Sequence, residues 1–192
     1  YVISQNQDFT FRPTFFDDDV KMFQNEYRVK NKNSSLFLDF SYVDRFKSAL
    51  NNKKKSISHI FANFDTDLAW KSFTQSDLLV SIKKVSSDTY LKIFDNNIYK
   101  NKTSPKNYDV LKSEAKLILR NKSYNFTTGL QSYEDLNLPN TDRYQFILPY
   151  YDFNMQLFKN DFDGTVNFSS NGSNDLNNTN NLRSKVVNNL NY

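Results

Sequence analysis

Apolar and polar residues alternate along most of this chain, and no other feature of the sequence constrains the fold as strongly. In about nine stretches the apolar or aromatic residues occupy every second position. A period of two places successive side chains on opposite faces of a β-strand. The sequence therefore predicts an all-β chain whose strands lie within 8–16, 21–29, 36–43, 58–65, 77–84, 110–119, 123–131, 142–151 and 165–170.

The connectors predict how these strands follow one another. Tight turns at 17–19, at 30–34 and near Asn121 alternate with longer polar loops at 46–56 and 96–107. This alternation is typical of an antiparallel up-and-down meander, as in a large outer-membrane β-barrel. Pro13 and Pro149 fall inside strand patterns, which favours an edge or a bulge at each.

The chain is expected to be an incomplete piece of such a barrel, because it opens on YVIS and ends on VVNNLNY, both strand-like. Residues 1–170 would form the barrel segment, and residues 171–192 an Asn-rich loop leading into a further strand. A barrel piece that cannot close would be an open sheet with exposed edges.

The stretch DRYQFILPYY at 142–151 raises the question of which solvent each face meets. Tyr144, Phe146, Leu148 and Tyr150 share one parity, while Arg143 and Gln145 share the other. In a soluble sandwich the apolar faces of two sheets pack together. In a membrane barrel the apolar face is the outside and the polar face lines the lumen.

Three features favour the membrane interpretation. Charged residues recur on the polar parity, several strand patterns reach the roughly 9–11 residues of a tilted membrane strand, and tyrosines gather near strand ends. The expected lumen-facing residues are Glu26, Arg28, Asp39, His59, Asn63, Lys112, Glu114, Lys116, Arg143 and Gln145. The expected lipid-facing residues are Leu36, Leu38, Phe40, Tyr42, Leu78, Val80, Ile82, Leu117, Leu119, Tyr144, Phe146 and Leu148.

Composition and motifs argue against several other functions. The net charge of +4 is small, and the basic run NKKKS at 52–56 is expected at a solvated loop tip, so no nucleic-acid partner is expected. A chain with one histidine and no cysteine offers a poor metal site. No nucleophile–base constellation, phosphate loop or dinucleotide fingerprint occurs, so neither an enzyme nor a cofactor is expected.

The order of several motifs resembles the LPS-assembly protein LptD family, also called the organic solvent tolerance (OstA) family. The motifs are FRPTFFDDDVKMFQNEYRVKNKNSSLFLDFSYV (11–43), SHIFANFDTDL (58–68), KVSSDTYLKIFD (84–95) and GLQSYEDLN…DRYQFILPYYDF (129–153). The resemblance covers roughly residues 1–170, and the succession is more specific than any single motif.

This resemblance implies a function and a set of partners. Members of the family are Gram-negative outer-membrane barrels that place lipopolysaccharide (LPS) in the outer leaflet through a lateral gate. It implies an LptE-type plug lipoprotein in the lumen, periplasmic LPS-bridge proteins that reach a domain outside this stretch, and surrounding outer-membrane lipids. Pro13 matches a proline in one of the first barrel strands and is the candidate residue of the lateral gate.

Two other interpretations remain open. A different outer-membrane barrel, such as a porin or a receptor, would share the alternation without the order of motifs. A soluble β-sandwich that binds glycans would use its aromatic residues to stack on sugars.

Overall fold

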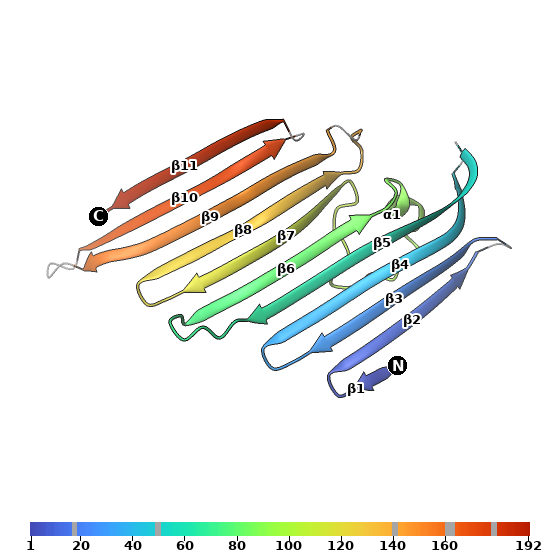
Figure 1. The fold of residues 1–192 in the computed structure, drawn as a ribbon, viewed down its shortest axis with the longest axis horizontal. Helices are drawn as coiled ribbons and strands as arrows, with labels where there is room; N and C mark the ends of the chain where they lie inside the picture. The colour runs from blue at the N-terminus through green and yellow to red at the C-terminus, as the bar shows by residue number, and fades with distance from the viewer. Residues whose placement is uncertain (17–18, 49–50, 140–141, 160–163, 178–179) are drawn as a thin grey trace. The chain divides into compact units, whose positions relative to one another are not determined.

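The computed structural model describes residues 1–16, 19–48, 51–139, 142–159, 164–177 and 180–192. In these residues eleven strands are hydrogen-bonded in the order of the sequence, so the predicted antiparallel up-and-down meander is confirmed (Figure 1). The sheet is open, because β1 and β11 are not neighbours in the strand order. The strands are β1 (Val2–Ser4), β2 (Gln7–Phe15), β3 (Lys21–Lys30), β4 (Ser34–Ser48), β5 (Asn51–Asp67), β6 (Gln75–Val85), β7 (Val110–Arg120), β8 (Tyr124–Asp135), β9 (Tyr144–Lys159), β10 (Thr165–Asn177) and β11 (Asn181–Asn191).

The chain divides into two units. The first contains 1–64 and 81–111, and the second contains 65–80 and 112–192. Several strands are long, with 15 residues in β4 and 17 in β5. Strands of soluble proteins are usually about 5–6 residues long, so these strands exceed what a small sandwich needs.

The register of the first unit sorts its side chains into two faces. Strand β3 pairs residue by residue with β2 and β4, without a bulge. Glu26 therefore lies between Thr10 and Asp39, while Tyr27 lies between Phe9 and Leu38. We call the side that carries Glu26 and Asp39 the polar face, and the side that carries Tyr27 the aromatic face.

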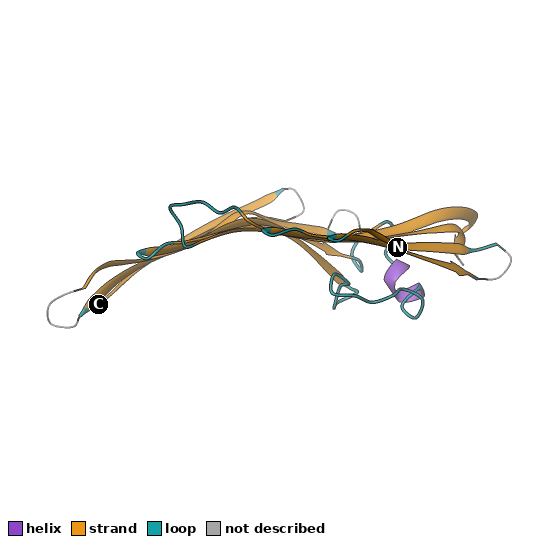
Figure 2. Cartoon of the chain, turned by 90° about the horizontal axis from the view of Figure 1, so that it is seen from below, coloured by secondary structure: helices purple, strands orange, loops and turns teal. Residues whose placement is uncertain are grey.

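One helix interrupts the strands in the described part of the chain. It is α1 (Tyr90–Ile93), within the segment of residues 86–109 that joins β6 to β7 and is here called the β6–β7 segment. Figure 2 shows α1 on one side of the neighbouring strands. The ring of Phe94 contacts those of Phe16 and Phe46, at centroid distances of 5.6 and 5.8 Å. None of the helices described has the length and apolar character that a bilayer crossing needs.

A bulge in β9 corrects one expectation for the second unit. Gln131 pairs with Ile147 but Gly129 pairs with Tyr150, so Leu148 and Pro149 together oppose a single residue of β8. The extra residue moves Tyr150 to the face of Gln131, away from Tyr144 and Phe146. The expectation that Tyr150 lies on the same face as Tyr144 and Phe146 was wrong, because a bulge shifts the alternation of faces by one position.

The expected number of strands and the expected Asn-rich loop also need correction. The structure has eleven strands, and residues 171–191 belong mostly to β10 and β11, which pair without a break from Asn167–Asn191 to Asn177–Asn181. Backbone hydrogen bonds, which need no apolar side chains, hold this hairpin. The basic run at 52–56 likewise lies within β5 and not in a loop.

Candidate functional site: a buried polar face

The polar face of the first unit is buried, and Asp39 of β4 is at its centre. The side chain of Asp39 is fully buried. Its carboxylate accepts hydrogen bonds from Gln24 Nε2 at 3.1 Å, His59 Nε2 at 3.2 Å and Asn101 Nδ2 at 2.7 Å. A buried carboxylate is tolerated when its oxygens are satisfied in this way.

Two side chains join this face to the backbone and side chains of the β6–β7 segment. Gln24 accepts a hydrogen bond from the backbone N–H of Tyr99 at 2.8 Å and donates one to its carbonyl oxygen at 3.1 Å. Asn101 donates to both Asp39 and Glu26, the latter at 3.0 Å. The carbonyl oxygen of the Asn101 side chain accepts from the backbone and hydroxyl of Thr103. The segment is therefore fixed to the sheet by polar contacts.

His59 of β5 links Asp39 to α1. Its Nε2 faces Asp39, and its Nδ1 lies 2.8 Å from the hydroxyl of Tyr90. Burial raises the pKa of Tyr90, and the charge of Asp39 raises it further, so this hydroxyl stays protonated. The Tyr90 hydroxyl and the Asp39 carboxylate therefore each lie within hydrogen-bond distance of one ring nitrogen of His59.

Hydrogen bonds join Asp39, His59 and Tyr90 in a row, as in a proton relay, but solvent and substrate cannot reach these side chains. His59 is 3% exposed and Tyr90 is fully buried. The imidazole also stacks on Phe61, with 4.3 Å between the ring centroids. No substrate can reach these atoms while the β6–β7 segment is in place, so the array fixes that segment to β5. In the described residues, histidine, aspartate and glutamate nowhere gather as a group of three that could hold a metal ion.

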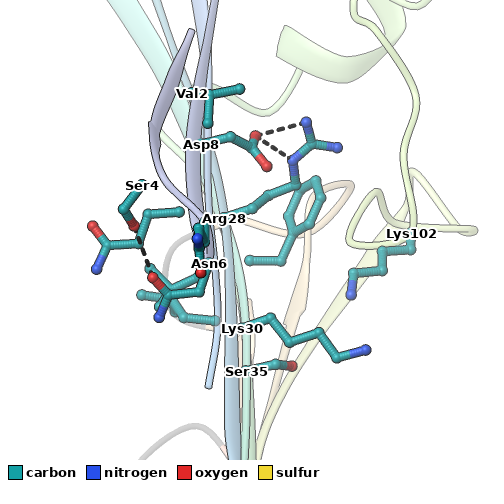
Figure 3. A pocket seen from close by; sticks show the side chains of 13 residues that line it. Val2, Ser4, Asn6, Asp8, Arg28, Lys30, Ser35 and Lys102 are labelled. Carbon is teal, nitrogen blue, oxygen red and sulfur yellow. Dashed lines mark hydrogen bonds and ion pairs between the residues drawn. The ribbon is translucent and has the colours of Figure 1, made fainter. Parts of the chain in front are cut away.

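The rim of the polar face carries ion pairs. Arg12 Nη1 lies 3.1 Å from Glu26 Oε2, and the Arg12 guanidinium stacks on the ring of Tyr99 at 3.6 Å from its centroid. Arg28 pairs with Asp8 at 2.6 Å, and both side chains are partly exposed (Figure 3). The charges on this face are therefore largely balanced across neighbouring strands.

The aromatic face has the opposite character, because large apolar side chains are exposed on it. Phe11 is 54% exposed and Phe15 is 68% exposed. Tyr42 and Ile60, on β4 and β5, are also exposed. The rings of Phe11 and Phe23 stack with centroids 6.0 Å apart. The first unit thus exposes aromatic side chains on one face, while on the other it buries polar groups together with apolar ones such as Met22, Phe61 and Leu91.

The second unit has a polar row of its own. Glu114 of β7 accepts hydrogen bonds from Gln131 Nε2 at 2.7 Å and from the Tyr150 hydroxyl at 2.9 Å, and Lys112 lies 3.2 Å from it. Gln145 pairs in register with Tyr133 on the face of Gln131. On the other face the rings of Tyr124 and Phe126 each contact Phe153.

Arg143 differs from the other expected lumen residues. It lies just before β9, and its Nε is 2.7 Å from Glu134 Oε1. Glu134 pairs in register with Tyr144, whose hydroxyl bonds the same carboxylate. Arg143 is therefore part of a buried ion pair at the ends of β8 and β9, separate from the row of Gln131 and Gln145.

The other expected site residues fall on two faces as the alternation predicted. Glu26, Arg28, Asp39 and His59 lie on the polar face, Asn63 has the parity of His59 and bonds Ser81, and Lys116 has the parity of Lys112 and Glu114. The aromatic face of the first unit carries Leu36, Leu38, Phe40 and Tyr42. The parity opposite to Ser81 in β6 is that of Leu78, Val80 and Ile82, and the parity opposite to Glu114 in β7 is that of Leu117 and Leu119. In β9, Tyr144 stacks on Phe146, and Leu148 lies at the bulge. Whether these faces meet lumen and lipid stays a prediction.

Pro13 lies opposite Phe23, and its nitrogen faces away from β3. The backbone N–H of Phe9 donates to Tyr1 on the outer side of β2. Residues two apart in a strand direct their N–H the same way, so the nitrogen of Pro13 is on that outer edge too. Strand β1 ends at Ser4 and pairs only with the start of β2. Pro13 therefore removes a donor from an edge that no described strand covers.

The sequence pattern did not identify Gln24, Tyr90 and Asn101 as residues of the site. Gln24 shares the parity of Glu26 and Arg28, and this signal could have identified it. Tyr90 and Asn101 belong to the β6–β7 segment, and their contacts join residues 31 to 75 positions apart. A local pattern carries no information about such contacts.

In comparisons with known proteins, no family model matches the chain, and no curated protein matches it.

Proposed function

We propose that this chain forms part of the wall of an outer-membrane β-barrel that carries lipopolysaccharide into the outer leaflet. The observation that carries the proposal is the row of exposed aromatic side chains in the first unit, where Phe11 and Phe15 are exposed on the face opposite to Asp39 and His59. Exposed aromatic rows suit hydrocarbon, and a polar face suits an aqueous lumen. The order of motifs from 11–43 to 129–153 favours the LPS-assembly family over other barrels.

In this proposal the chain makes and breaks no covalent bond. The polar parity of the strands beyond the β6–β7 segment faces the lumen, where the sugars and phosphates of the lipid pass, while the acyl chains follow an apolar path. The edge of β2 supplies a seam that can open sideways, because Pro13 leaves it one donor short. A plug lipoprotein in the lumen and periplasmic bridge proteins, which deliver the lipid, are the partners of the whole protein.

The test is a pulse-chase crosslinking experiment on the full-length protein in Gram-negative cells. A photoreactive p-benzoylphenylalanine replaces Asn63 on the polar parity in one variant and Ile60 on the aromatic face in the other. We expect newly made LPS to crosslink at position 63 during the pulse and to leave during the chase. Absence of any transient LPS adduct at position 63 would contradict the proposal.

Two further measurements separate the alternatives. A porin would give steady diffusive conductance when the purified protein enters a planar bilayer, whereas a lipid carrier with an occupied lumen would not. A soluble glycan-binding sandwich would remain in solution without detergent, and its aromatic residues would be protected by a second sheet.

A further inference from the structure

Five aromatic rings follow one another along one end of the second unit. Trp70 and Phe73 belong to the connection between β5 and β6, Tyr124 is the first residue of β8, and Phe153 lies in β9. The centroids of successive rings in this order are 6.0, 6.1 and 5.8 Å apart. Phe168 of β10 continues the series, with its centroid 6.2 Å from that of Phe153. We call these five rings the aromatic row.

The aromatic row lies on the apolar face of the second unit and is not covered. Tyr124 and Phe168 both pair in register with Met155, so their rings lie on the side opposite to Asn125. The side chain of Trp70 is 46% exposed, and the other four rings of the row are half-buried. Each ring therefore keeps part of its surface free for another molecule.

The backbone before Trp70 holds its ring out of the sheet. Ala69 has a φ of 52°, a left-handed conformation that residues other than glycine rarely adopt. The carboxylate of Asp67 accepts a hydrogen bond from the N–H of Ala69 at 2.8 Å, and Ser76 Oγ accepts one from the N–H of Trp70 at 3.0 Å. Unusual backbone that is fixed in this way is found most often where a protein binds something.

The connection that carries Trp70 is joined to the β7–β8 turn. The backbone N–H of Thr74 donates to the carbonyl oxygen of Arg120 at 2.8 Å, and Asn121 Nδ2 donates to the carbonyl oxygen of Ser72 at 3.1 Å. Figure 1 shows the β5–β6 connection and the β7–β8 turn at the same end of their strands. We call these two joined turns the turn rim.

Two exposed lysines lie on the turn rim beside the aromatic row. Lys71 directly follows Trp70, and Lys122 precedes Tyr124 by two positions. Among the described residues neither lysine forms an ion pair. Tryptophan and tyrosine prefer the boundary between acyl chains and headgroups, and a long lysine side chain can pass along apolar surface to place its ammonium at the headgroups.

The lengths of the connections indicate which leaflet the turn rim meets. At this end of β6 and β7 the chain turns within residues 68–74 and 121–123, whereas the other end carries the β6–β7 segment. In outer-membrane barrels the short turns are periplasmic and the longer loops are external. The proposed function places LPS in the outer leaflet, so the leaflet on the periplasmic side is the one made of glycerophospholipids.

We propose that the aromatic row lies at the boundary between acyl chains and headgroups of the periplasmic phospholipid leaflet, with Lys71 and Lys122 facing the lipid phosphates. Trp70 suits this boundary because its indole is apolar over most of its surface and has one N–H that donates to water or to a headgroup. The inference rests on the proposed function only in that the sheet lies in the outer membrane, and it is independent of the cargo.

Fluorescence quenching in proteoliposomes of the full-length protein tests the depth of Trp70. The emission of wild type minus that of W70F isolates this residue, and the lipid is phosphatidylcholine brominated either near the headgroup or near the chain ends. We expect a larger loss of this emission with the shallow label than with the deep one. An equal or larger loss with the deep label would overturn the proposal, as would no loss with either.

A matched control occupies the polar face next to Tyr124. N125W in the W70F background, measured against W70F, reports a tryptophan at the exposed position 125 on the opposite side of β8. We expect its emission to be quenched by aqueous acrylamide and to lose little with either brominated lipid. The same loss as at Trp70 would show that the labels do not distinguish the two faces and would overturn the proposal.

Photocrosslinking in Gram-negative cells identifies the leaflet. With p-benzoylphenylalanine in place of Trp70 in the full-length protein, we expect a phospholipid adduct and no LPS adduct. The same probe in place of Asn125 should give no phospholipid adduct. An LPS adduct at position 70 would place the turn rim in the outer leaflet and overturn the proposal, and so would the absence of any lipid adduct there.

These measurements separate this inference from the proposed function. If Trp70 shows the expected quenching and phospholipid adduct while position 63 gives no transient LPS adduct, the boundary position stands and LPS transport fails. If position 63 gives the transient LPS adduct while Trp70 shows neither quenching by lipid nor a phospholipid adduct, the boundary position fails and LPS transport stands.

Discussion

At the scale of single residues, Asp39 connects the polar face to its cover. Its carboxylate accepts from Gln24 and His59 on the neighbouring strands and from Asn101 on the β6–β7 segment. An asparagine at this position would keep one acceptor oxygen but would turn its NH2 group toward donors that now reach the second carboxylate oxygen. Asp39 is therefore the residue whose loss should release the segment with the least change in shape.

Asp39→Asn should weaken the attachment of the β6–β7 segment. Leaving buried donors unsatisfied costs about 1–3 kcal/mol, so the free energy of local opening should fall by that amount. Amide hydrogen exchange of residues 98–103 in the full-length protein would report it. Asp44→Asn is the matched control on the same strand, because Asp44 makes only a partly exposed pair with Arg45 at 3.5 Å. Equal protection in the two variants would contradict this role.

Tyr90 gives a prediction about pH. Burial raises its pKa above the usual value of 10.0, so the folded chain holds this proton more tightly than the unfolded chain. The stabilisation is fully present below about pH 10 and is lost as the pH rises further. Tyr90→Phe should lower the free energy of unfolding by about 1 kcal/mol at pH 8 and should remove this part of the alkaline loss. Denaturant unfolding from pH 8 to 11.5 would measure the free energy of unfolding and its dependence on pH, with Tyr27→Phe as the control. Parallel curves of this free energy against pH for wild type and Tyr90→Phe would contradict the prediction.

At the scale of elements, β2 and β9 each carry a proline, and the two have different consequences. Pro149 belongs to the bulge that brings Tyr150 to Glu114. Pro13 leaves the pairing of β2 with β3 intact from Gln7 to Phe15, because its nitrogen faces the uncovered edge. The sequence placed both prolines in strands, but only the register separates a bulge from an edge.

Pro13→Ala should restore one N–H to the outer edge of β2. Stability should change by less than about 0.5 kcal/mol, because no described partner is gained. In the proposed function the seam would pair more tightly, so LPS should reach the outer leaflet more slowly. Surface labelling of newly made LPS would measure the rate, with Pro139→Ala in a connector as the control. Unchanged export in Pro13→Ala would remove Pro13 from the gate.

A larger residue at Gly129 of β8 should lower stability by crowding the bulge in β9. A Cβ at this position would overlap the carbonyl oxygen of Ala115 and approach the Tyr150 hydroxyl to 2.8 Å. Gly129→Ala should therefore destabilise by about 1–3 kcal/mol and move Tyr150 away from Glu114. Urea unfolding and near-ultraviolet circular dichroism would detect both effects. Asn125→Ala, an exposed position on the same face of β8, should change stability little; a similarly small effect at Gly129 would show that the strands separate easily.

The strand pattern could be predicted from local sequence, and the cover of the polar face could not. Alternation places Glu26 and Asp39 on one face because it is a property of neighbouring residues. The hydrogen bond between Gln24 and the backbone of Tyr99 joins positions that are 75 residues apart. The alternation of apolar and polar residues does not relate positions so far apart. The strand character of 171–177 was missed for a different reason. Its alternation is weak, and pairing with β9 and β11 supplies what the pattern lacks.

At the scale of the whole molecule, the character of the two faces bears on whether the sheet lies in a membrane or in water. A soluble protein with Phe11 and Phe15 exposed on one sheet would need a second sheet or a partner to cover them. No second sheet occurs in the described residues, where all strands belong to one sheet. The polar face, which a soluble sheet would turn to solvent, is instead covered by the β6–β7 segment. In the proposed function a bilayer covers the aromatic face, and the β6–β7 segment lies on the lumen side of the other face.

A pair of arginine substitutions on β5 puts this choice to the test. Ile60 lies on the aromatic face and is 43% exposed, while Asn63 has the opposite parity three residues away. A lipid-facing arginine near the bilayer midplane costs about 2–4 kcal/mol, so Ile60→Arg should reduce the folded, membrane-inserted fraction of the full-length protein. Asn63→Arg, which keeps the charge in the lumen, should have a much smaller effect. Heat-modifiable mobility of the membrane fraction would report both.

A sheet surrounded by water predicts the reverse order for these two variants. Ile60→Arg would then replace an exposed apolar side chain with a charged one and should raise solubility without loss of stability. Asn63→Arg would introduce a bulky cation beside the contact of Asn63 with Ser81, at 2.9 Å, and should be the more damaging change. The two environments therefore give opposite rankings for the same pair of substitutions, and the ranking is independent of which lipid or partner the whole protein handles.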